Sequence, residues 1–247
     1  MPPSSAVIIA LDCASKIGLA VASVRPFVDE VLVLDGGSTD ATVDVARAAG
    51  ARVVAHPFDG FVSQKRRAVA LARHDGVFLL DSDEIVDPEL GRSLHEACRS
   101  ALPPAGFLVS RRNYLDGVAL RASGWGRDRP LRLFDRRMAG VDGVDPHDRV
   151  VARPGAALLR GVLHHDPQRG TAAYVRGTVR HARSAARSLA RSGRPGPWAP
   201  ALHGLAHLLR KLVLGFALMD GRRGLTVAWV GAKGVERKYR LARRLSA

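Results

Sequence analysis

The fold is decided by one stretch, Phe78-Leu79-Leu80-Asp81-Ser82-Asp83-Glu84, in which an apolar run ends in acidic side chains. A short apolar run of this kind predicts a buried β-strand. Asp81 and Asp83 are two positions apart, so in extended chain their side chains point to the same side. Both carboxylates can therefore reach one ligand.

Working outward, three similar runs precede this one and alternate with helical stretches. We expect strands at residues 6–11, 30–35, 51–55 and 76–81. Such alternation predicts βαβ units and a mostly parallel sheet, an α/β fold. Ser38-Thr39-Asp40 offers N-cap side chains for a helix through Ala49, and Gly50 follows at the C-cap position.

Acidic residues stand where the second and fourth strands end, at Asp35 and at Asp81 with Asp83. Ligands of such sheets bind beyond the carboxyl ends of the strands. Mg²⁺ or Mn²⁺ is typically held by one or two carboxylates plus substrate phosphates, so this edge predicts a metal and a nucleotide diphosphate. The alternatives are a solvated turn for the Asp-x-Asp pair and a cap on the Gly36-Gly37 turn for Asp35.

The rest of the chain is less regular and ends in helices. After a helix at residues 88–100 we expect strands and loops over 106–163, a helix over 169–191, a linker over 192–200 and two further helices, one over 202–219 with an apolar stripe. The helix over 169–191 carries arginines spaced to share one face, namely Arg176, Arg180, Arg183, Arg187 and Arg191.

Charge is divided unevenly along the 247 residues, whose net charge is +15. Residues 1–150 hold 19 Lys and Arg against 20 Asp and Glu, whereas residues 151–247 hold 19 against 3. A basic nucleic-acid-binding module is one reading, but aromatics are scarce beside the arginines and no recognition motif is present. An arginine stripe beside an amphipathic helix instead predicts binding to an anionic membrane surface.

The two cysteines, Cys13 and Cys98, lack metal-ligand spacing and do not indicate a disulfide framework. The first residues lack a signal-peptide pattern, and no apolar run is long enough to span a bilayer. We therefore expect a cytoplasmic chain, peripheral at the inner face of the plasma membrane.

Several motifs occur in a fixed order along nearly the whole chain. They are Leu34-Asp35-Gly36-Gly37-Ser38-Thr39-Asp40, Asp59-Gly60-Phe61 with Gln64-Lys65, Asp81-Ser82-Asp83-Glu84, Arg111-Arg112-Asn113-Tyr114, Gly124-Trp125 with Asp128, Leu131-Arg132-Leu133-Phe134, Pro146-His147-Asp148-Arg149-Val150, and Gly215-Phe216 with Asp220-Gly221 and Gly224-Leu225. With these motifs the chain resembles a family 2 glycosyltransferase of the GT-A fold, of the lipopolysaccharide core glucosyltransferase type.

The resemblance implies a metal-dependent, inverting transfer from a nucleotide sugar, a UDP-sugar, to a glycan or lipid-linked acceptor in cell-envelope synthesis. It implies a nucleotide-sugar half at residues 1–105, an acceptor half with the catalytic base at 106–168, and a basic helical region at 169–247. Asp35 would contact the base or ribose and Lys65 the diphosphate. Asp81 would serve the ribose and metal, and Asp83 would be the principal metal ligand.

An inverting transfer needs one carboxylate to take the proton of the attacking hydroxyl. Asp148 is the candidate, with Asp145 and Asp128 as rivals, and a salt bridge of Asp148 with Arg149 or Arg132 is the structural alternative. Trp125 is a candidate for stacking on a sugar, or else a buried aromatic.

The chain departs from the family pattern in the first loop, where relatives usually have an Asn-Glu pair and this chain has Asp12-Cys13. Asp148 also stands where the family usually has Glu. These departures keep open a second hypothesis, a catalytically inactive relative that binds a nucleotide sugar.

Overall fold

The structure is a computed structural model that describes residues 3–99, 103, 105–122, 125–126, 128–145, 147–166, 170–191 and 193–246, with the backbone alone for His147. Gly124 and Pro146 of the motifs, and the expected helix and linker starts at Arg169 and Ser192, lie outside the described residues. The chain divides into two compact units. Unit 1 comprises Met1–Arg111 with Arg129–Asp166, and unit 2 comprises Arg112–Asp128 with Pro167–Ala247.

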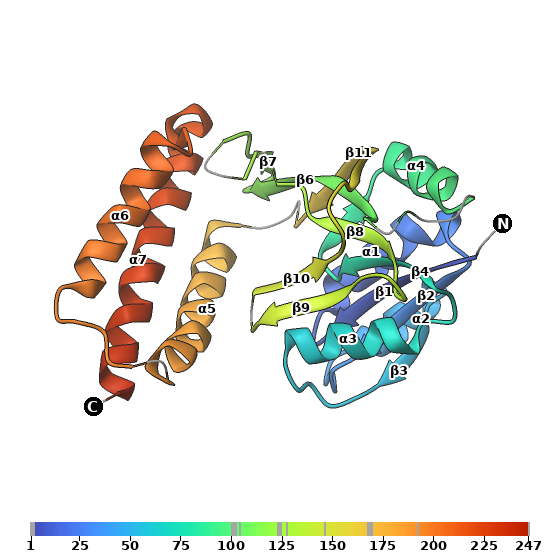
Figure 1. Ribbon diagram of the computed structural model, residues 1–247, viewed down its shortest axis with the longest axis horizontal. Helices are drawn as coiled ribbons and strands as arrows, with labels where there is room; N and C mark the ends of the chain where they lie inside the picture. The colour runs from blue at the N-terminus through green and yellow to red at the C-terminus, as the bar shows by residue number, and fades with distance from the viewer. Residues whose placement is uncertain are drawn as a thin grey trace. The chain divides into compact units, whose positions relative to one another are not determined.

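Helices and strands alternate over the first half of the chain (Figure 1). The helices are α1 (Ala14–Val24), α2 (Thr42–Ala48), α3 (Phe61–Leu71), α4 (Pro88–Cys98), α5 (Thr171–Arg191), α6 (Ala199–Val213) and α7 (Gly221–Leu245), with 3-10 turns η1 (Arg25–Phe27) and η2 (Ala217–Asp220). The strands are β1 (Ser4–Ala10), β2 (Glu30–Asp35), β3 (Arg52–Ala55), β4 (Gly76–Asp81), β5 (Glu84–Val86), β6 (Phe107–Leu115), β7 (Val118–Ala119), β8 (Leu131–Asp135), β9 (Gly140–Val144), β10 (His147–Val151) and β11 (Ala157–His165).

The main sheet has the strand order β3-β2-β1-β4-β8-β6-β11-β5. The first four of these strands are parallel, as the βαβ alternation predicted, and β8 then pairs antiparallel to β4. The expected α/β fold is confirmed, with its parallel part confined to the four N-terminal strands.

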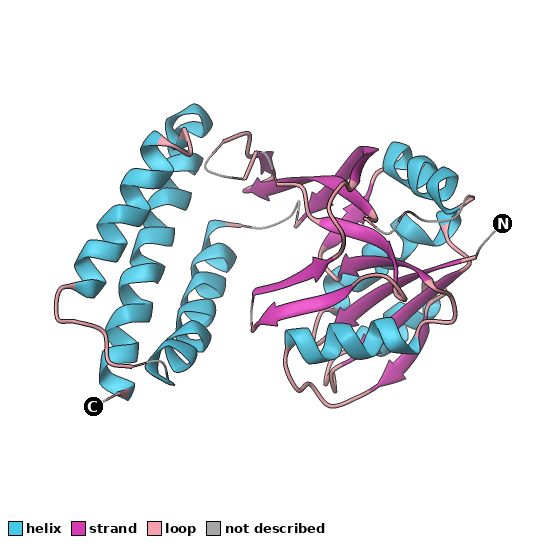
Figure 2. Ribbon diagram, in the orientation of Figure 1, coloured by secondary structure: helices cyan, strands magenta, loops and turns pink. Residues whose placement is uncertain are grey.

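Helices cover both faces of the parallel strands (Figure 2). Alternate residues of β1 point to opposite faces, because side chains alternate along a strand. Ile8 packs with buried residues of α1, α2 and α4, whereas Val7 packs with α3 and with Val141 of β9. Strands buried on both faces explain the continuous apolar runs in the sequence.

Helix α2 begins later than the N-cap residues predicted. It starts at Thr42, whose N–H donates to Asp40 Oδ1 at 2.9 Å, whereas the Ser38 and Thr39 side chains bind the loop after β1. Asp12 Oδ1 accepts a hydrogen bond from the Thr39 N–H (2.7 Å), and Ser38 Oγ accepts one from the Asp12 N–H (2.9 Å). Gly50 follows the helix with φ of +93°, the conformation expected of a C-cap glycine.

The region after α4 is made of strands and loops, as expected. Strands β9 and β10 form an antiparallel hairpin with Asp148 opposite Gly143. Strand β11 pairs with β5, which brings His165 opposite Glu84, directly after the acidic segment. The hairpin and β11 both belong to unit 1.

In unit 2, α7 lies between α5 and α6 and packs against both (Figure 1). The five arginines of α5 are all exposed, so the predicted stripe is confirmed. Two boundaries differ from expectation. Ala199 and Pro200 belong to α6 rather than to the linker, because proline is tolerated in a first helical turn, and α6 ends at Val213 rather than 219.

Within the described ranges, no single helix is long and apolar enough to cross a membrane. The segments Ala199–Val213 and Ala217–Leu245 meet the length and composition requirement together, but the chain bends by 71° between them.

Candidate active site

The carboxyl ends of the parallel strands bring the predicted acidic residues to one edge of the sheet. Residue Ala10 of β1 pairs with Asp35 of β2, and Ile9 pairs with Asp81 of β4. Asp35 and Asp81 therefore flank the end of the same central strand, as the sequence predicted for a parallel sheet.

Asp81 is held by two cationic side chains. Its Oδ1 lies 2.7 Å from Lys65 Nζ, and its Oδ2 accepts a hydrogen bond from Arg132 Nη2 at 2.7 Å. Burial opposes ionisation of Asp81, but the attraction of Lys65 and Arg132 outweighs it, so the pKa of Asp81 is held well below its usual range. Asp81 is a permanent anion of the site.

Glu84 holds Asp81 in place through the Asp81 backbone and through Arg132. Its side chain is fully buried, accepts a hydrogen bond from Arg132 Nη2 at 2.6 Å, and accepts one from the Asp81 N–H at 2.9 Å. Arg111 Nη1 lies 3.2 Å from the same carboxylate. A buried charge requires such partners, so Glu84 and Arg132 together set the position of Asp81. Arg132 Nε is itself buried, and none of the residues that the structure describes accepts a hydrogen bond from it.

Asp83 differs from Asp81 in its surroundings. Its Oδ1 lies 3.6 Å from His165 Nε2, and its side chain is 24% exposed. Burial raises the pKa of Asp83; His165 partly offsets this, and neighbouring Asp81, Glu84 and Asp166 raise the pKa further. A carboxylate whose negative charge is disfavoured by acidic neighbours is a site that a divalent cation would stabilise.

Among the residues that the structure describes, no group of three or more His, Cys, Asp or Glu side chains is arranged to hold a metal ion. Asp81 ends β4, whereas Asp83 lies in the turn before β5 rather than in the extended chain that the sequence argument assumed. Two protein carboxylates are nevertheless the number that Mg²⁺ commonly takes when substrate phosphates complete its shell. The residues present therefore fit a metal bound together with a nucleotide diphosphate.

Lys65, which the resemblance assigned to the diphosphate, links the sheet edge to the β9–β10 hairpin. Its Nζ donates a hydrogen bond to Asp148 Oδ2 at 2.8 Å while it contacts Asp81. Burial lowers the pKa of Lys65, but attraction to Asp81 and Asp148 outweighs it despite Arg132, so the pKa is raised. Asp148 does form a salt bridge, the structural alternative that we considered, but with Lys65 as the contacting cation; Arg132 acts on it by longer-range attraction.

Asp145 stabilises the start of α3. Its Oδ1 accepts a hydrogen bond from the Val62 N–H at 2.9 Å, in the first turn of α3. The first backbone N–H groups of a helix lack intrahelical partners, so a carboxylate there stabilises the helix start. Gly60, with φ of +119°, leaves the space that this carboxylate occupies.

Asp35 caps its own turn, the alternative considered for it. Its Oδ2 accepts hydrogen bonds from the Gly37 and Ser38 N–H groups, both at 3.0 Å, and the residue is 3% exposed. A contact of Asp35 with a nucleotide stays a prediction.

Trp125 and Asp128 belong to unit 2. Trp125 meets the ring of Tyr174 edge-on with centroids 5.5 Å apart, and it packs against the small core of Leu115, Leu120 and Val227. Asp128 Oδ2 lies 3.4 Å from Asn113 Nδ2. Packing in a core is the alternative considered for Trp125, and the sugar-stacking role stays a prediction.

Asp12 and Cys13, the unusual pair, form a defined loop after β1. Asp12 has φ of +46°, and the Cys13 N–H donates to Thr42 Oγ1 at 2.7 Å. Burial raises the pKa of the Cys13 thiol. The side chains therefore organise the link between β1 and α2.

The sequence-based candidate list lacked several residues of the cluster, namely Glu84, Arg111, Arg132 and His165. Glu84, Arg111 and Arg132 stand inside the quoted motifs, so their charge within otherwise buried strands was the available signal. His165 gave no comparable signal, because the pairing of β11 with β5 is needed to place it.

Asp81 and Asp148 thus meet on Lys65 at the edge of the sheet. The family model for glycosyl transferase family 2 matches residues 5–164, and the chain belongs to that family. An uncharacterized glycosyltransferase of Rickettsia felis is 42% identical over 90 residues, which cover 36% of this chain and 32% of the relative.

Two relatives with more specific names align over longer stretches. The lipopolysaccharide core biosynthesis glycosyltransferase LpsC of Rhizobium meliloti is 29% identical over 67% of this chain and 64% of its own length. Glucosyl-3-phosphoglycerate synthase of Mycolicibacterium paratuberculosis is 36% identical over 64% of this chain and 48% of its own length. The chain thus spans from a third to two thirds of these relatives.

Among solved structures, glucosyl-3-phosphoglycerate synthase from Mycobacterium tuberculosis, in complex with Mn²⁺, UDP and glucosyl-3-phosphoglycerate, is 31% identical over 46% of this chain and 44% of its own, with a TM-score of 0.39.

Proposed function

We propose that this chain moves a hexose from a UDP-sugar to a hydroxyl of a glycan or lipid-linked acceptor, with inversion and with a divalent metal. The single observation that carries the proposal is the convergence of Asp81 and Asp148 on Lys65 at the carboxyl end of β4, with Asp83 two residues further along the chain beside His165. Carboxylates and an ammonium at one sheet edge suit a nucleotide diphosphate with a bound metal ion, because the carboxylates can bind the metal and the ammonium can bind the phosphate.

Asp83, together with Asp81, would hold Mg²⁺ or Mn²⁺. The metal would supply charge neutralisation for the diphosphate as it leaves the sugar. Asp81 is kept ionised by Lys65 and Arg132, so it remains available as an oxygen ligand throughout the physiological pH range. Lys65 would bind a phosphate oxygen. Its ammonium is shared by two carboxylates and can exchange one of them for the more highly charged diphosphate.

Asp148 would be the base that accepts the proton of the attacking hydroxyl. It stands on the hairpin, and its side chain is 15% exposed, so an acceptor can reach it. Of its rivals, Asp145 is committed to the start of α3. Asp148 is separate from the proposed metal ligands, but its ion pair with Lys65 would couple activation of the acceptor to binding of the sugar donor.

The names of the relatives support the substrate class. LpsC is named for lipopolysaccharide core biosynthesis, and the synthase is named for transfer of a glucosyl group. We extend these names to a cell-envelope acceptor and to a cytoplasmic enzyme that works at the inner face of the plasma membrane.

A thermal-shift panel of UDP, UDP-sugars and other nucleotide sugars, each with and without Mn²⁺, tests the sugar donor and the metal. A ligand that binds the folded state alone raises the apparent stability by about 2.7 kcal/mol at a hundred times its Kd. We expect a UDP-sugar to stabilise the protein only with metal, and Asp83→Asn to remove that effect. Asp59→Asn, at an exposed carboxylate, is the matched control. Equal stabilisation with and without Mn²⁺ would refute the metal assignment.

A further inference from the structure

Helix α6 packs on α7 through a side of mixed composition. Gly204 is buried, and its position lies against the backbone of Ala232. The ring of His203 stacks on Tyr239 with centroids 4.2 Å apart. His207 lies over Gly231, and burial lowers the pKa of this imidazole. The side of α6 that contacts its neighbour therefore combines glycine and histidine with the half-buried Leu208 and Leu212.

The apolar side of α6 faces solvent. Leu202, Leu205, Leu209 and Val213 recur at helical spacing and are 64%, 54%, 51% and 64% exposed. A surface helix of a globular protein normally turns such a stripe toward the core and its charges toward water. In α6 the stripe of Leu202, Leu205, Leu209 and Val213 is turned to solvent instead.

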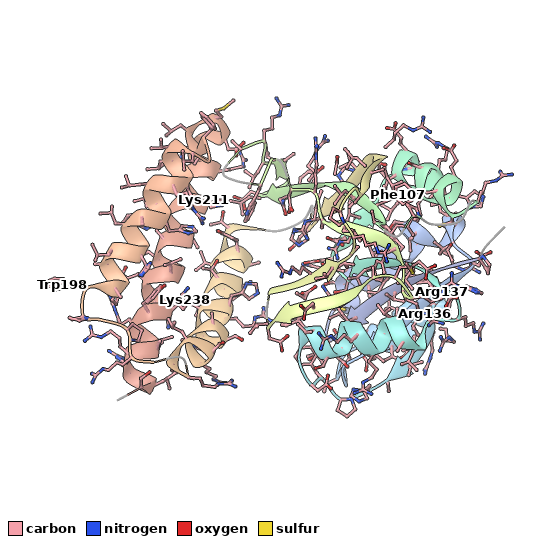
Figure 3. All side chains as sticks on the ribbon, viewed as in Figure 1. Phe107, Arg136, Arg137, Trp198, Lys211 and Lys238 are labelled. Carbon is pink, nitrogen blue, oxygen red and sulfur yellow. The ribbon has the colours of Figure 1, made fainter. Side chains whose placement is uncertain are left out.

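The same exposure continues through the bend that follows α6. Phe216 adopts the left-handed conformation with φ of +50°, which turns the chain into η2. The apolar face consists of residues that are each between 51% and 77% exposed, namely Leu202, Leu205, Leu209, Val213, Leu214, Phe216, Leu218 and Met219. Trp198, at the start of α6, is 74% exposed and points away from the helices of unit 2 (Figure 3). Contiguous apolar exposure of this extent marks an interaction site.

The charges around the apolar face identify its partner. Residues 193–247 hold 11 Lys and Arg against two acids, Asp220 and Glu236. Arg210 and Arg222, close in sequence to the apolar residues, are both exposed. A second copy of this chain would bring the same excess of positive charge against itself, whereas an anionic lipid surface complements that charge.

The length of α6 indicates how it would meet a bilayer. Its 15 residues extend about 22 Å, shorter than the roughly 30 Å of a hydrocarbon core. An amphipathic helix with cationic flanks and exposed tryptophan lies in the interfacial plane.

We propose that the apolar face of α6 and η2 inserts into the interface of an anionic bilayer, with Arg210 and Arg222 at the headgroups. The idea that this binding brings the enzyme to a lipid-linked acceptor rests on the function proposed above. Membrane binding itself needs neither a sugar donor nor a metal.

The test uses the full chain and two vesicle types, pure phosphatidylcholine and an equal mixture with phosphatidylglycerol, each also made with acyl-brominated lipid. We expect sedimentation with the anionic vesicles, weaker sedimentation at high salt, and quenching of tryptophan fluorescence by the bromines. Leu205→Gln with Leu209→Gln should weaken binding at least about tenfold, because the insertion free energy scales with buried apolar area. Leu19→Gln on α1, equally exposed at 51%, is the matched control and should bind as the unchanged chain does.

Three results would overturn the proposal: no sedimentation at low salt, sedimentation without quenching, or a dimer in lipid-free solution that Leu205→Gln with Leu209→Gln dissociates. The last would mean that a second copy covers the face. The thermal shift with a UDP-sugar and Mn²⁺ is measured on the same variants. Loss of vesicle binding with that shift retained therefore separates this surface from the catalytic proposal.

Discussion

Lys65 Nζ lies 2.8 Å from Asp148 Oδ2, although the two residues are 83 positions apart in the sequence. This contact joins α3 to the β9–β10 hairpin, and α3 and the hairpin also meet where Arg66 Nε donates to the Val141 carbonyl. The proposed base and the proposed phosphate ligand therefore share one ion pair, and binding of an anionic substrate at Lys65 would change the surroundings of Asp148.

Lys65→Met removes the ammonium and keeps most of the aliphatic stem. It leaves Asp148 and one oxygen of Asp81 without their cation, so we expect a loss of about 2–3 kcal/mol in unfolding free energy by urea titration. Binding of a UDP-sugar should weaken as well. Arg67→Met, in an exposed pair with Asp59 on the same helix, should change stability by less than about 1 kcal/mol. Equal stability of the two variants would contradict a structural role for the buried pair.

The parallel half of the fold was predictable because its signals are local. Each apolar run is a strand, and the acids that follow β2 and β4 share an edge because parallel strands end together. The arginine stripe of α5 followed from helical periodicity alone.

The remaining contacts depend on pairing across long sequence distances. The register of the β9–β10 hairpin, which places Asp148 beside Lys65, cannot be predicted from the local sequence of the hairpin or of α3. The late start of α2 has the same origin, since Ser38 and Thr39 bind the Asp12 loop instead of capping the helix. The end of α6 at Val213 reflects a backbone turn at Phe216 that an apolar pattern does not reveal.

Asp148 and Asp145 can be told apart by one pair of variants. Asp148→Ala should lower kcat for transfer by about 10²–10⁴, because a positioned base contributes that much, with little change in the KM for the sugar donor. Asp145→Ala should lower stability by about 0.5–2 kcal/mol through loss of the acceptor at Val62, and leave kcat nearly unchanged. Steady-state kinetics and urea titration check both. The reverse pattern would make Asp145 the base.

Gly60→Ala should destabilise the start of α3. A Cβ at this position would lie 2.2 Å from Asp145 Oδ2, in a residue with φ of +119°. We expect a loss of about 2–4 kcal/mol, which combines backbone strain with displacement of the capping carboxylate. Gly155→Ala, with φ of +99° and nothing within 4 Å, isolates the backbone part and should cost about 1 kcal/mol. Similar losses in both variants would mean that Asp145 moves aside at no cost.

Glu30 predicts how stability depends on pH, away from the candidate active site. It is 6% exposed and accepts hydrogen bonds from Ser5 Oγ, Arg52 Nε and the Arg73 N–H, at 2.6, 2.8 and 2.7 Å. Burial raises the pKa of Glu30, but these donors outweigh it, so its pKa falls below the ordinary 4.5. The unfolded chain takes up this proton first as pH falls, so the stability from Glu30 is complete above about pH 4.5 and is lost as pH drops through the folded-state pKa.

Glu30→Gln should therefore lower the free energy of unfolding by about 1–3 kcal/mol at pH 7. This difference from the unchanged chain should shrink as the pH falls below about 4.5. Urea titrations across this pH range measure the difference directly. Glu89→Gln, an exposed residue in the first turn of α4, is the matched control and should cost less than about 1 kcal/mol at pH 7. A difference at Glu30 that stays constant from pH 7 into the acid range would show that the loss comes from packing rather than from the ionised carboxylate.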